Sequence, residues 1–255
     1  MSNVLKKSTF NKGVLATMIG LLTFIVSVSL TLGAGVAEGA ANTSSKAAIA
    51  KKSRYTFKMS DGNTNYDIYI YSSKETKGVE SDSWACAKKG EPYYTGTYTA
   101  AVFKQGSSTP TYLNLGKQYF NPQSKKSYAY VVSGKPDLLA INTCEASSVA
   151  SVNLFYMNQN NLVAVKNTLY TINGKNIKSI GNLQFQSVFY DNADDVGYHF
   201  ENWQFNKSKA SLTLKKTYSL SESTGMLDFS TGIYEYWLSH PAYKVDEHTF
   251  EEDED

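Results

Sequence analysis

Residues 66–71 read Tyr-Asp-Ile-Tyr-Ile-Tyr, an alternation that places every second residue on the same face of an extended chain. Residues 138–141, Leu-Leu-Ala-Ile, are instead apolar at every position, as expected for an inner strand that is covered on both faces. Between residues 54 and 225, no stretch keeps a helical period of apolar residues over three turns. The sequence therefore predicts an all-β fold.

Turn-forming residues separate these short runs. The clearest examples are Asp61-Gly62, Asn173-Gly174 and Ser133-Gly134-Lys135-Pro136. Glycine adopts the positive φ angles of tight turns, and Asp and Asn side chains accept hydrogen bonds from the following backbone. Each of these sites is predicted to be a turn between two such runs.

Three predicted strand–turn–strand units have similar sequence patterns. They span residues 98–115, 152–165 and 198–214, and their first strands end at Phe103, Tyr156 and Phe205, at spacings of 53 and 49 residues. Periods of roughly 40–50 residues built from short antiparallel strands are typical of propeller blades. We therefore expect an antiparallel meander that is β-propeller-like, and about 200 residues would supply roughly four blades. A β-sandwich is the alternative, because no glycine or Trp-Asp signature repeats with the units.

The N-terminus has the order of a secretory signal peptide: basic, then apolar, then small residues. Three lysines lie in the first twelve residues, and no charged residue occurs between Gly13 and Ala37. Cleavage is expected after Ala41, with Ala37 as the second choice, so residues 1–41 are predicted to be removed. The alternative is an uncleaved membrane anchor, since an uncharged run of roughly 25 residues can span a bilayer. A leader of this length favours a bacterial source.

The remaining chain divides by composition. Residues 42–53 are small and polar and are predicted to be a flexible spacer, and residues 54–245 a single all-β domain that ends in a last strand pair or a short helix. Residues 246–255 contain seven acidic residues and no Lys or Arg, which predicts a disordered acidic tail.

The predicted domain is basic, because residues 42–245 contain 22 Lys and Arg against 15 Asp and Glu. Such an excess attracts anionic cell-wall polymers or membranes, although it also serves solubility alone. Arg54 is the only arginine, which argues against a nucleic-acid partner because base edges are read best by arginine forks.

Cys86 and Cys144 are the only cysteines, 58 residues apart. In an exported protein such a pair is expected to form a disulfide, and closing a loop of this length contributes about 4 kcal/mol in the chain-entropy model. Two free structural thiols are the alternative. A catalytic thiol is disfavoured because no local signature supplies a histidine partner.

No catalytic residues are predicted. The sequence lacks a P-loop, a Gly-x-Gly-x-x-Gly fingerprint, a Gly-x-Ser-x-Gly elbow and a His-Glu-x-x-His motif. The three histidines, His199, His240 and His248, are too scattered for a metal site.

The densest polar segment follows Tyr190. Asp191, Asp194 and Asp195 fall within five residues and could hold Ca²⁺ through oxygen ligands, although the spacing differs from the Asp-x-Asp-x-Asp-Gly loop. The alternative is a plain hairpin connection in which Gly197 takes a positive φ.

Aromatic residues in the same segment suggest a ligand-binding platform. Tyr190, Tyr198 and Trp203 lie close to amide and acidic groups, a combination that suits sugar recognition, although strands also use aromatics for cross-strand packing. Asp195 with Glu201 is the carboxylate pair that a glycosidase would need.

We therefore expect a secreted, non-enzymatic all-β protein that binds an extracellular or cell-wall partner, with Ca²⁺ as the only cofactor considered. One alternative is a secreted hydrolase that uses carboxylates. The other is an envelope protein anchored by its uncleaved N-terminal segment, the one case in which a membrane is a partner.

Overall fold

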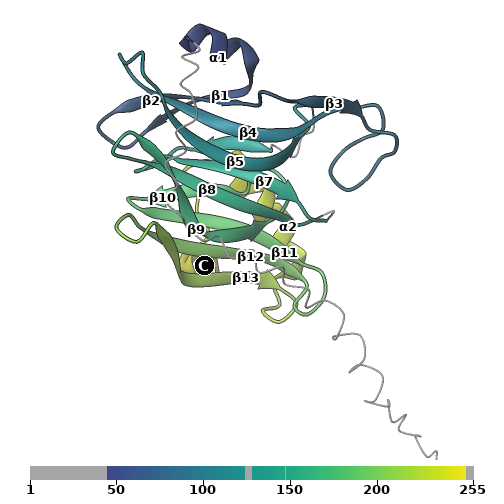
Figure 1. Cartoon of the computed structure of the whole chain (residues 1–255). Helices are drawn as coiled ribbons and strands as arrows, with labels where there is room; N and C mark the ends of the chain where they lie inside the picture. Colours follow the sequence, from purple (N-terminus) through teal and green to yellow (C-terminus); the bar gives the residue numbers. More distant parts are fainter. Residues whose placement is uncertain (1–44, 124–127, 147, 251–255) are drawn as a thin grey trace, which may run out of the picture. The chain divides into compact units, whose positions relative to one another are not determined.

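The computed structural model describes residues 45–123, 128–146 and 148–250. The predicted signal peptide lies outside these residues. Within them, thirteen strands form three antiparallel sheets, which confirms the all-β meander (Figure 1).

The first sheet is built around one long strand, β4. It contains β1 (Ser53–Ser60), β2 (Asn65–Tyr71), β3 (Thr76–Val79), β4 (Pro92–Lys104) and β5 (Thr111–Phe120). The order is β1-β2-β4-β3, and β5 pairs with the other edge of β4. β2 and β3 thus share one edge of β4, because β2 pairs with its second half and β3 with its first.

The other two sheets are simple four-stranded meanders. The middle sheet contains β6 (Ala129–Val132), β7 (Leu138–Cys144), β8 (Ala150–Asn158) and β9 (Asn161–Thr171), in that order. The third sheet contains β10 (Ile177–Gly181), β11 (Gln184–Asp191), β12 (Gly197–Asn206) and β13 (Ser211–Ser221), also in sequence order.

The three similar sequence units are the last hairpins of the three sheets, β4–β5, β8–β9 and β12–β13, and each carries a register shift. The blade estimate was too high, because the described residues form three sheets and not four. The first sheet uses more chain than a blade of average length, with 13 residues in β4 alone, and the segment after β13 forms a helix. The sheets pack face to face, as in a sandwich.

The predicted turns join β1 to β2, β6 to β7 and β9 to β10. In the first of them, Asp61 Oδ1 accepts hydrogen bonds from the backbone N–H groups of Asn63 (2.9 Å) and Thr64 (2.8 Å). The Asp side chain thus satisfies the turn backbone, as its position before Gly62 predicts.

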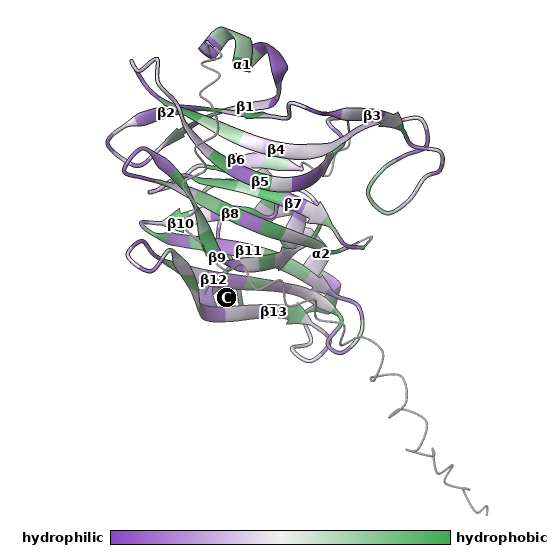
Figure 2. Cartoon of the chain, viewed as in Figure 1, coloured by the Kyte–Doolittle hydropathy of each residue, from purple (hydrophilic) through white to green (hydrophobic). Residues whose placement is uncertain are grey.

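The middle sheet is covered on both faces. Leu139 and Ile141 pack against the first sheet, while Leu138 and Ala140 pack against the third, and all four are at most 1% exposed. The run 138–141 is therefore an inner strand, as its unbroken apolar sequence predicts. Figure 2 shows hydrophobic residues within the strands of the stack and hydrophilic residues at many of the turns.

The segment predicted to be a spacer contains a helix, α1 (Lys46–Lys52). Ser45 caps it by accepting a hydrogen bond from Ala48 N at 3.3 Å. Ile49 is 1% exposed and packs on the outer face of the first sheet against Phe103 and its neighbours. Ile49 and the neighbouring Ala50 attach this short segment to the sheet, because that face of the sheet is itself apolar.

Helix α2 (Leu227–Ser239) covers the outer face of the third sheet, which decides between the two structures expected for this segment. Trp237 is 2% exposed and its ring lies 5.7 Å from that of Phe200. The buried side chain of Gln186 accepts a hydrogen bond from Trp237 Nε1 at 2.7 Å and donates one to the Val245 carbonyl at 2.8 Å. This amide holds the helix and the chain that follows it onto the sheet.

The start of the predicted acidic tail is ordered by the third sheet. Residues Glu247–Phe250 form a 3-10 helix, η2, and the ring of Phe250 stacks on Tyr218 at 6.1 Å. Glu247 Oε2 accepts hydrogen bonds from Tyr218 Oη (2.7 Å) and Lys216 Nζ (3.2 Å). Composition alone predicts a solvated tail, whereas cationic and phenolic partners on β13 bind the carboxylate of Glu247. Residues 251–255 lie outside the described chain.

Glu247 should make stability depend on pH. The hydrogen bonds from Tyr218 and Lys216 lower the pKa of Glu247 to about 2, from 4.5. Its contribution is therefore complete above about pH 5 and is lost as the pH falls towards 2. The difference in unfolding free energy between wild type and Glu247→Gln, measured by urea titration, should shrink steadily from pH 6 to pH 3. Glu222→Gln, at an exposed turn position, should show no such trend, and a pH-independent Glu247→Gln difference would contradict this role.

Candidate functional site

The acidic segment is the hairpin connection between β11 and β12. Asp191 Oδ1 accepts hydrogen bonds from Ala193 N (2.8 Å) and Asp194 N (3.3 Å), and these bonds lower the pKa of Asp191. Gly197 has a φ of 153°, and a Cβ there would lie 2.3 Å from the Leu220 carbonyl oxygen. Glycine is therefore needed for β12 to approach β13.

The three aspartates do not converge on a calcium site. Both oxygens of Asp195 are used by the turn after β13, since they accept from Ser223 N (3.1 Å), Ser223 Oγ (2.9 Å) and Ser221 Oγ (2.8 Å). These bonds lower the pKa of Asp195. No group of three or more His, Cys, Asp or Glu among the described residues is arranged to hold a metal ion. The carboxylates of Asp191 and Asp195 therefore serve as turn caps.

The three aromatic residues predicted to form one platform lie on opposite faces of the third sheet. Tyr190 and Tyr198 are cross-strand partners with ring centroids 4.8 Å apart, and Tyr198 stacks on Tyr234 of α2 at 4.5 Å. Trp203 packs on the other face, against the middle sheet. Successive strand residues point to opposite faces, so an even-numbered and an odd-numbered residue of β12 cannot share a platform.

The two carboxylates expected to form a glycosidase pair, Asp195 and Glu201, have different surroundings. Asp195 is held by the turn after β13, whereas Glu201 lines a small cavity with Trp203, and no other carboxylate is among the described residues that line it. His199 is 6% exposed, with Nε2 donating to the Asp195 carbonyl at 3.0 Å and Nδ1 2.9 Å from Ser219 Oγ. The histidine is thus a satisfied interior residue.

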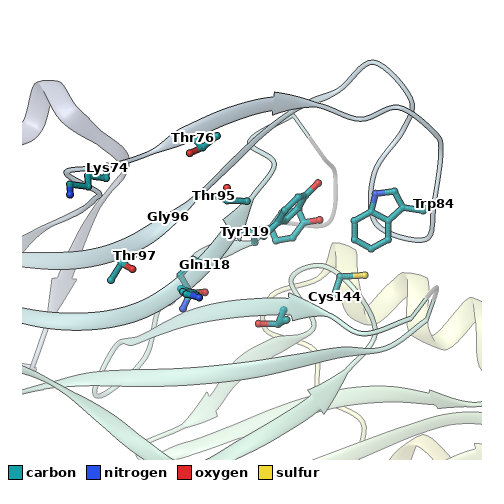
Figure 3. Close-up of a pocket in the computed structure, with 12 residues that line it drawn as sticks. Lys74, Thr76, Trp84, Thr95, Gly96, Thr97, Gln118, Tyr119 and Cys144 are labelled. Carbon is teal, nitrogen blue, oxygen red and sulfur yellow. The ribbon is translucent and has the colours of Figure 1, made fainter.

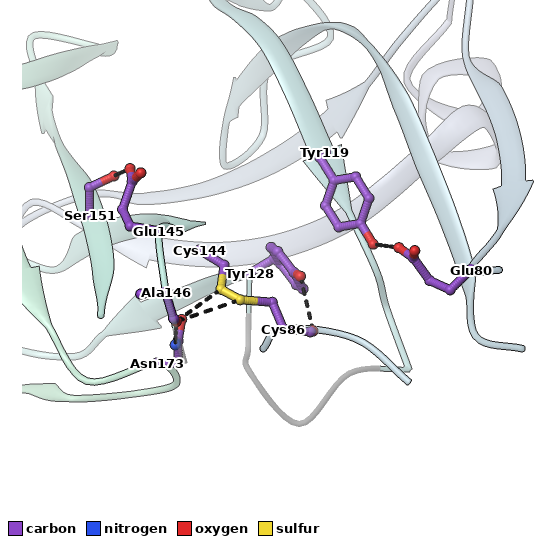
Figure 4. The surroundings of a disulfide bond; sticks show 9 residues. All are labelled: Glu80, Cys86, Tyr119, Tyr128, Cys144, Glu145, Ala146, Ser151 and Asn173. Carbon is purple, nitrogen blue, oxygen red and sulfur yellow. Dashed lines mark hydrogen bonds between the residues drawn. A yellow bond between two sulfur atoms is a disulfide. The ribbon is translucent and has the colours of Figure 1, made fainter. Parts of the chain in front are cut away.

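Cys86 and Cys144 form a disulfide, as their isolation in the sequence predicts, with Cα atoms 6.2 Å apart (Figure 4). The bond ties the loop between β3 and β4 to the end of β7, and so joins the first sheet to the middle sheet. Tyr128 Oη donates to the Cys86 carbonyl at 3.2 Å and supports the same loop.

Beside the disulfide lies a cavity of about 670 Å³, larger than three others on the described residues, whose volumes are about 350, 340 and 280 Å³ (Figure 3). Its walls come from β3, β4 and β5 of the first sheet, from β7 of the middle sheet and from the loops beside them. The lining residues are Lys74, Thr76, Trp84, Thr95, Gly96, Thr97, Lys117, Gln118, Tyr119, Tyr128, Thr143 and Cys144.

One wall of this cavity is aromatic. Tyr119 is central: its ring lies 6.0 Å from Trp84, 5.5 Å from Tyr128 and 5.4 Å from Tyr93, which stacks on it. Trp84 is 46% exposed, although it is held two residues from the disulfide. An exposed indole on a covalently fixed loop presents a rigid apolar face to a ligand.

The rest of the described lining is largely polar and basic. Thr95 pairs with Tyr119 and Thr97 with Lys117 across the β4–β5 ladder, and Lys74 lies in the turn before β3. A Cβ on Gly96 would lie 2.8 Å from Ser72 Oγ and 3.0 Å from the Lys74 carbonyl oxygen. Glycine at this position therefore lets the turn that carries Lys74 cross close above β4.

No Asp, Glu or His is among the described residues that line the cavity. Outside the lining, the carboxylate of Glu80 accepts a hydrogen bond from the Tyr119 hydroxyl (Figure 4). Burial and this bond raise the pKa of Tyr119 above its usual range, so the phenol stays protonated. The charge facing the cavity is therefore that of Lys74 and Lys117.

Sequence reasoning did not select these residues, because they come from six segments between residues 74 and 144. One signal was available: Trp84 stands in a polar loop two residues before Cys86. A tryptophan beside a disulfide cysteine in a loop is held in place without being part of a strand core.

None of the helices in the described ranges is both long enough and apolar enough to cross a membrane. No known family model matches the chain, and no curated protein or solved structure matches it.

Proposed function

We propose that the protein is exported and binds an anionic, hydroxyl-rich partner outside the cell, such as an acidic polysaccharide of the cell wall or cell surface, without altering it. The observation that carries this proposal is the composition of the 670 Å³ cavity. It combines an exposed tryptophan, a row of threonines and two lysines.

Each of these groups has a part in recognising such a partner. The faces of Trp84 and Tyr119 offer stacking surfaces to a sugar ring. The hydroxyls of Thr76, Thr95 and Thr97 both donate and accept, as a polyol requires. Lys74 and Lys117 supply the positive charge that a carboxylate or phosphate on the partner would need.

Binding is favoured over hydrolysis by the acid–base chemistry of the same cavity. Glycoside hydrolysis uses two carboxylates placed across the scissile bond. Thr, Gln, Lys and protonated Tyr, the polar groups on its described lining, do not supply that pair. The hydrolase alternative has no comparable observation in its favour.

Export is supported by the disulfide and by the order of residues at the N-terminus. Disulfides persist mainly in oxidising compartments. A basic patch around Lys74 and Lys117 is also consistent with a partner in an anionic cell wall.

Replacing both cavity lysines should weaken binding of an acidic glycan. We expect Lys74→Gln/Lys117→Gln to bind a uronic-acid oligosaccharide about tenfold or more weakly than wild type, since two partly screened charge interactions are lost. Isothermal titration at low and high salt measures this. Lys209→Gln/Lys215→Gln, a matched pair of exposed lysines away from the cavity, should bind as wild type does.

Three outcomes would overturn the proposal: equal binding of the acidic glycan and its neutral glucose counterpart, an unaffected Lys74→Gln/Lys117→Gln variant, or no binding of either glycan at millimolar concentration. Shortened oligosaccharides in the mixture, seen by mass spectrometry, would instead favour a hydrolase.

The exported form should begin near Asn42 and carry the linked peptides of Cys86 and Cys144. N-terminal sequencing and non-reduced peptide mapping of protein from the culture medium check both. A chain that retains Met1 and stays in the membrane would favour the anchored alternative, and alkylated thiols in native secreted protein would remove the disulfide.

A further inference from the structure

A second cavity, of about 280 Å³, lies where the middle and third sheets meet. It is lined by Thr168, Leu169 and Tyr170 of β9, Phe189 of β11, and Glu201 and Trp203 of β12. None of these residues lines the 670 Å³ cavity. It is therefore a separate site, whose chemistry is different.

The charged group among the described residues of this cavity is the carboxylate of Glu201. Glu201 Oε2 accepts a hydrogen bond from Ser187 Oγ at 3.3 Å, and Ser187 Oγ in turn accepts one from Trp203 Nε1 at 2.9 Å. No ion pair among the described residues includes Glu201. Burial raises the pKa of this carboxyl group, and Ser187, His199 and Trp203 offset only part of that rise.

The other walls suit a positive charge. Tyr170, Phe189 and Trp203 are aromatic, and the negative faces of aromatic rings attract cations near them. Tyr170 is 60% exposed, so the site is open to solvent on that side. The nearby His199 donates its Nε2 hydrogen to the Asp195 carbonyl and stacks on one face of Phe189 at 4.8 Å, which leaves the other face of that ring for a ligand.

We propose that this cavity binds an organic ammonium group, held by the Glu201 carboxylate and by the rings of Phe189 and Trp203, with Tyr170 at its solvent-exposed rim. The volume suits a small group and not a large ligand. A metal ion is a poorer occupant, because Glu201 is the only carboxylate among the described residues of the lining. The ammonium group would come from a lysine side chain or from a quaternary amine, since both share this chemistry.

The test is an NMR titration of the full mature chain with n-butylammonium, tetramethylammonium and the neutral alcohol 3,3-dimethyl-1-butanol, following the three indole N–H resonances. The Trp203 resonance, assigned by its loss in Trp203→Phe, should shift with at least one cation and much less with the alcohol. The primary and quaternary cations distinguish the two sources. Trp84 lies at the other cavity and should not shift, so this result does not depend on the proposed glycan site.

Glu201→Gln keeps the size of the side chain and removes its charge. It should weaken cation binding about tenfold or more while leaving the weak binding of the alcohol unchanged. Tyr170→Ala, at an exposed position that folding does not need, should weaken cation binding several-fold. Glu222→Gln is the matched control and should bind as wild type does.

Any of four results would overturn the proposal. The Trp203 resonance could shift equally with cation and alcohol, or not at all at millimolar cation. The shifts could be confined to Trp84, or cation binding could be unchanged in both Glu201→Gln and Tyr170→Ala. Since Tyr170 is mostly exposed, its variant decides the matter even where Glu201→Gln disturbs the fold.

Discussion

The structure depends on the middle sheet, whose inner strand β7 is covered on both faces over residues 138–141. The middle strand β7 carries apolar side chains on both sides, so its sheet must be covered twice. The first and third sheets supply that cover, and α1 and α2 then cover apolar parts of their outer faces. The order helix, three sheets, helix follows from burying each apolar surface in turn, at about 25 cal/mol per Å² of apolar area.

Both cavities lie where residues of neighbouring sheets meet. The larger is walled by strands of the first and middle sheets, and the smaller by strands of the middle and third sheets. They differ in charge, because lysines face one and a glutamate faces the other. The disulfide lies beside the larger cavity, where it fixes the loop that carries Trp84 to the end of β7. The two proposed ligands, an acidic polymer and an ammonium group, would thus bind the protein at two independent sites.

Local sequence patterns predicted the strands, the turns, the paired cysteines and the three equivalent hairpins, because period, turn chemistry and redox environment act over short distances. The prediction of one aromatic platform was wrong, and the sequence itself contains the reason. Tyr198 and Trp203 are an odd number of residues apart on β12, so their side chains lie on opposite faces of the sheet. The ordered start of the tail could not be foreseen, since Glu247 is held by Tyr218 and Lys216 of β13. The larger cavity depends on long-range packing of six segments, which no local pattern encodes.

Native-state hydrogen exchange tests most directly whether the doubly covered sheet holds the rest together. If it does, the backbone amides of β7 and β8 should exchange most slowly, at the free energy of global unfolding, while the first and third sheets open at lower cost. Slowest exchange in β4–β5 or β12–β13, with β7 exchanging through a smaller local opening, would contradict the account.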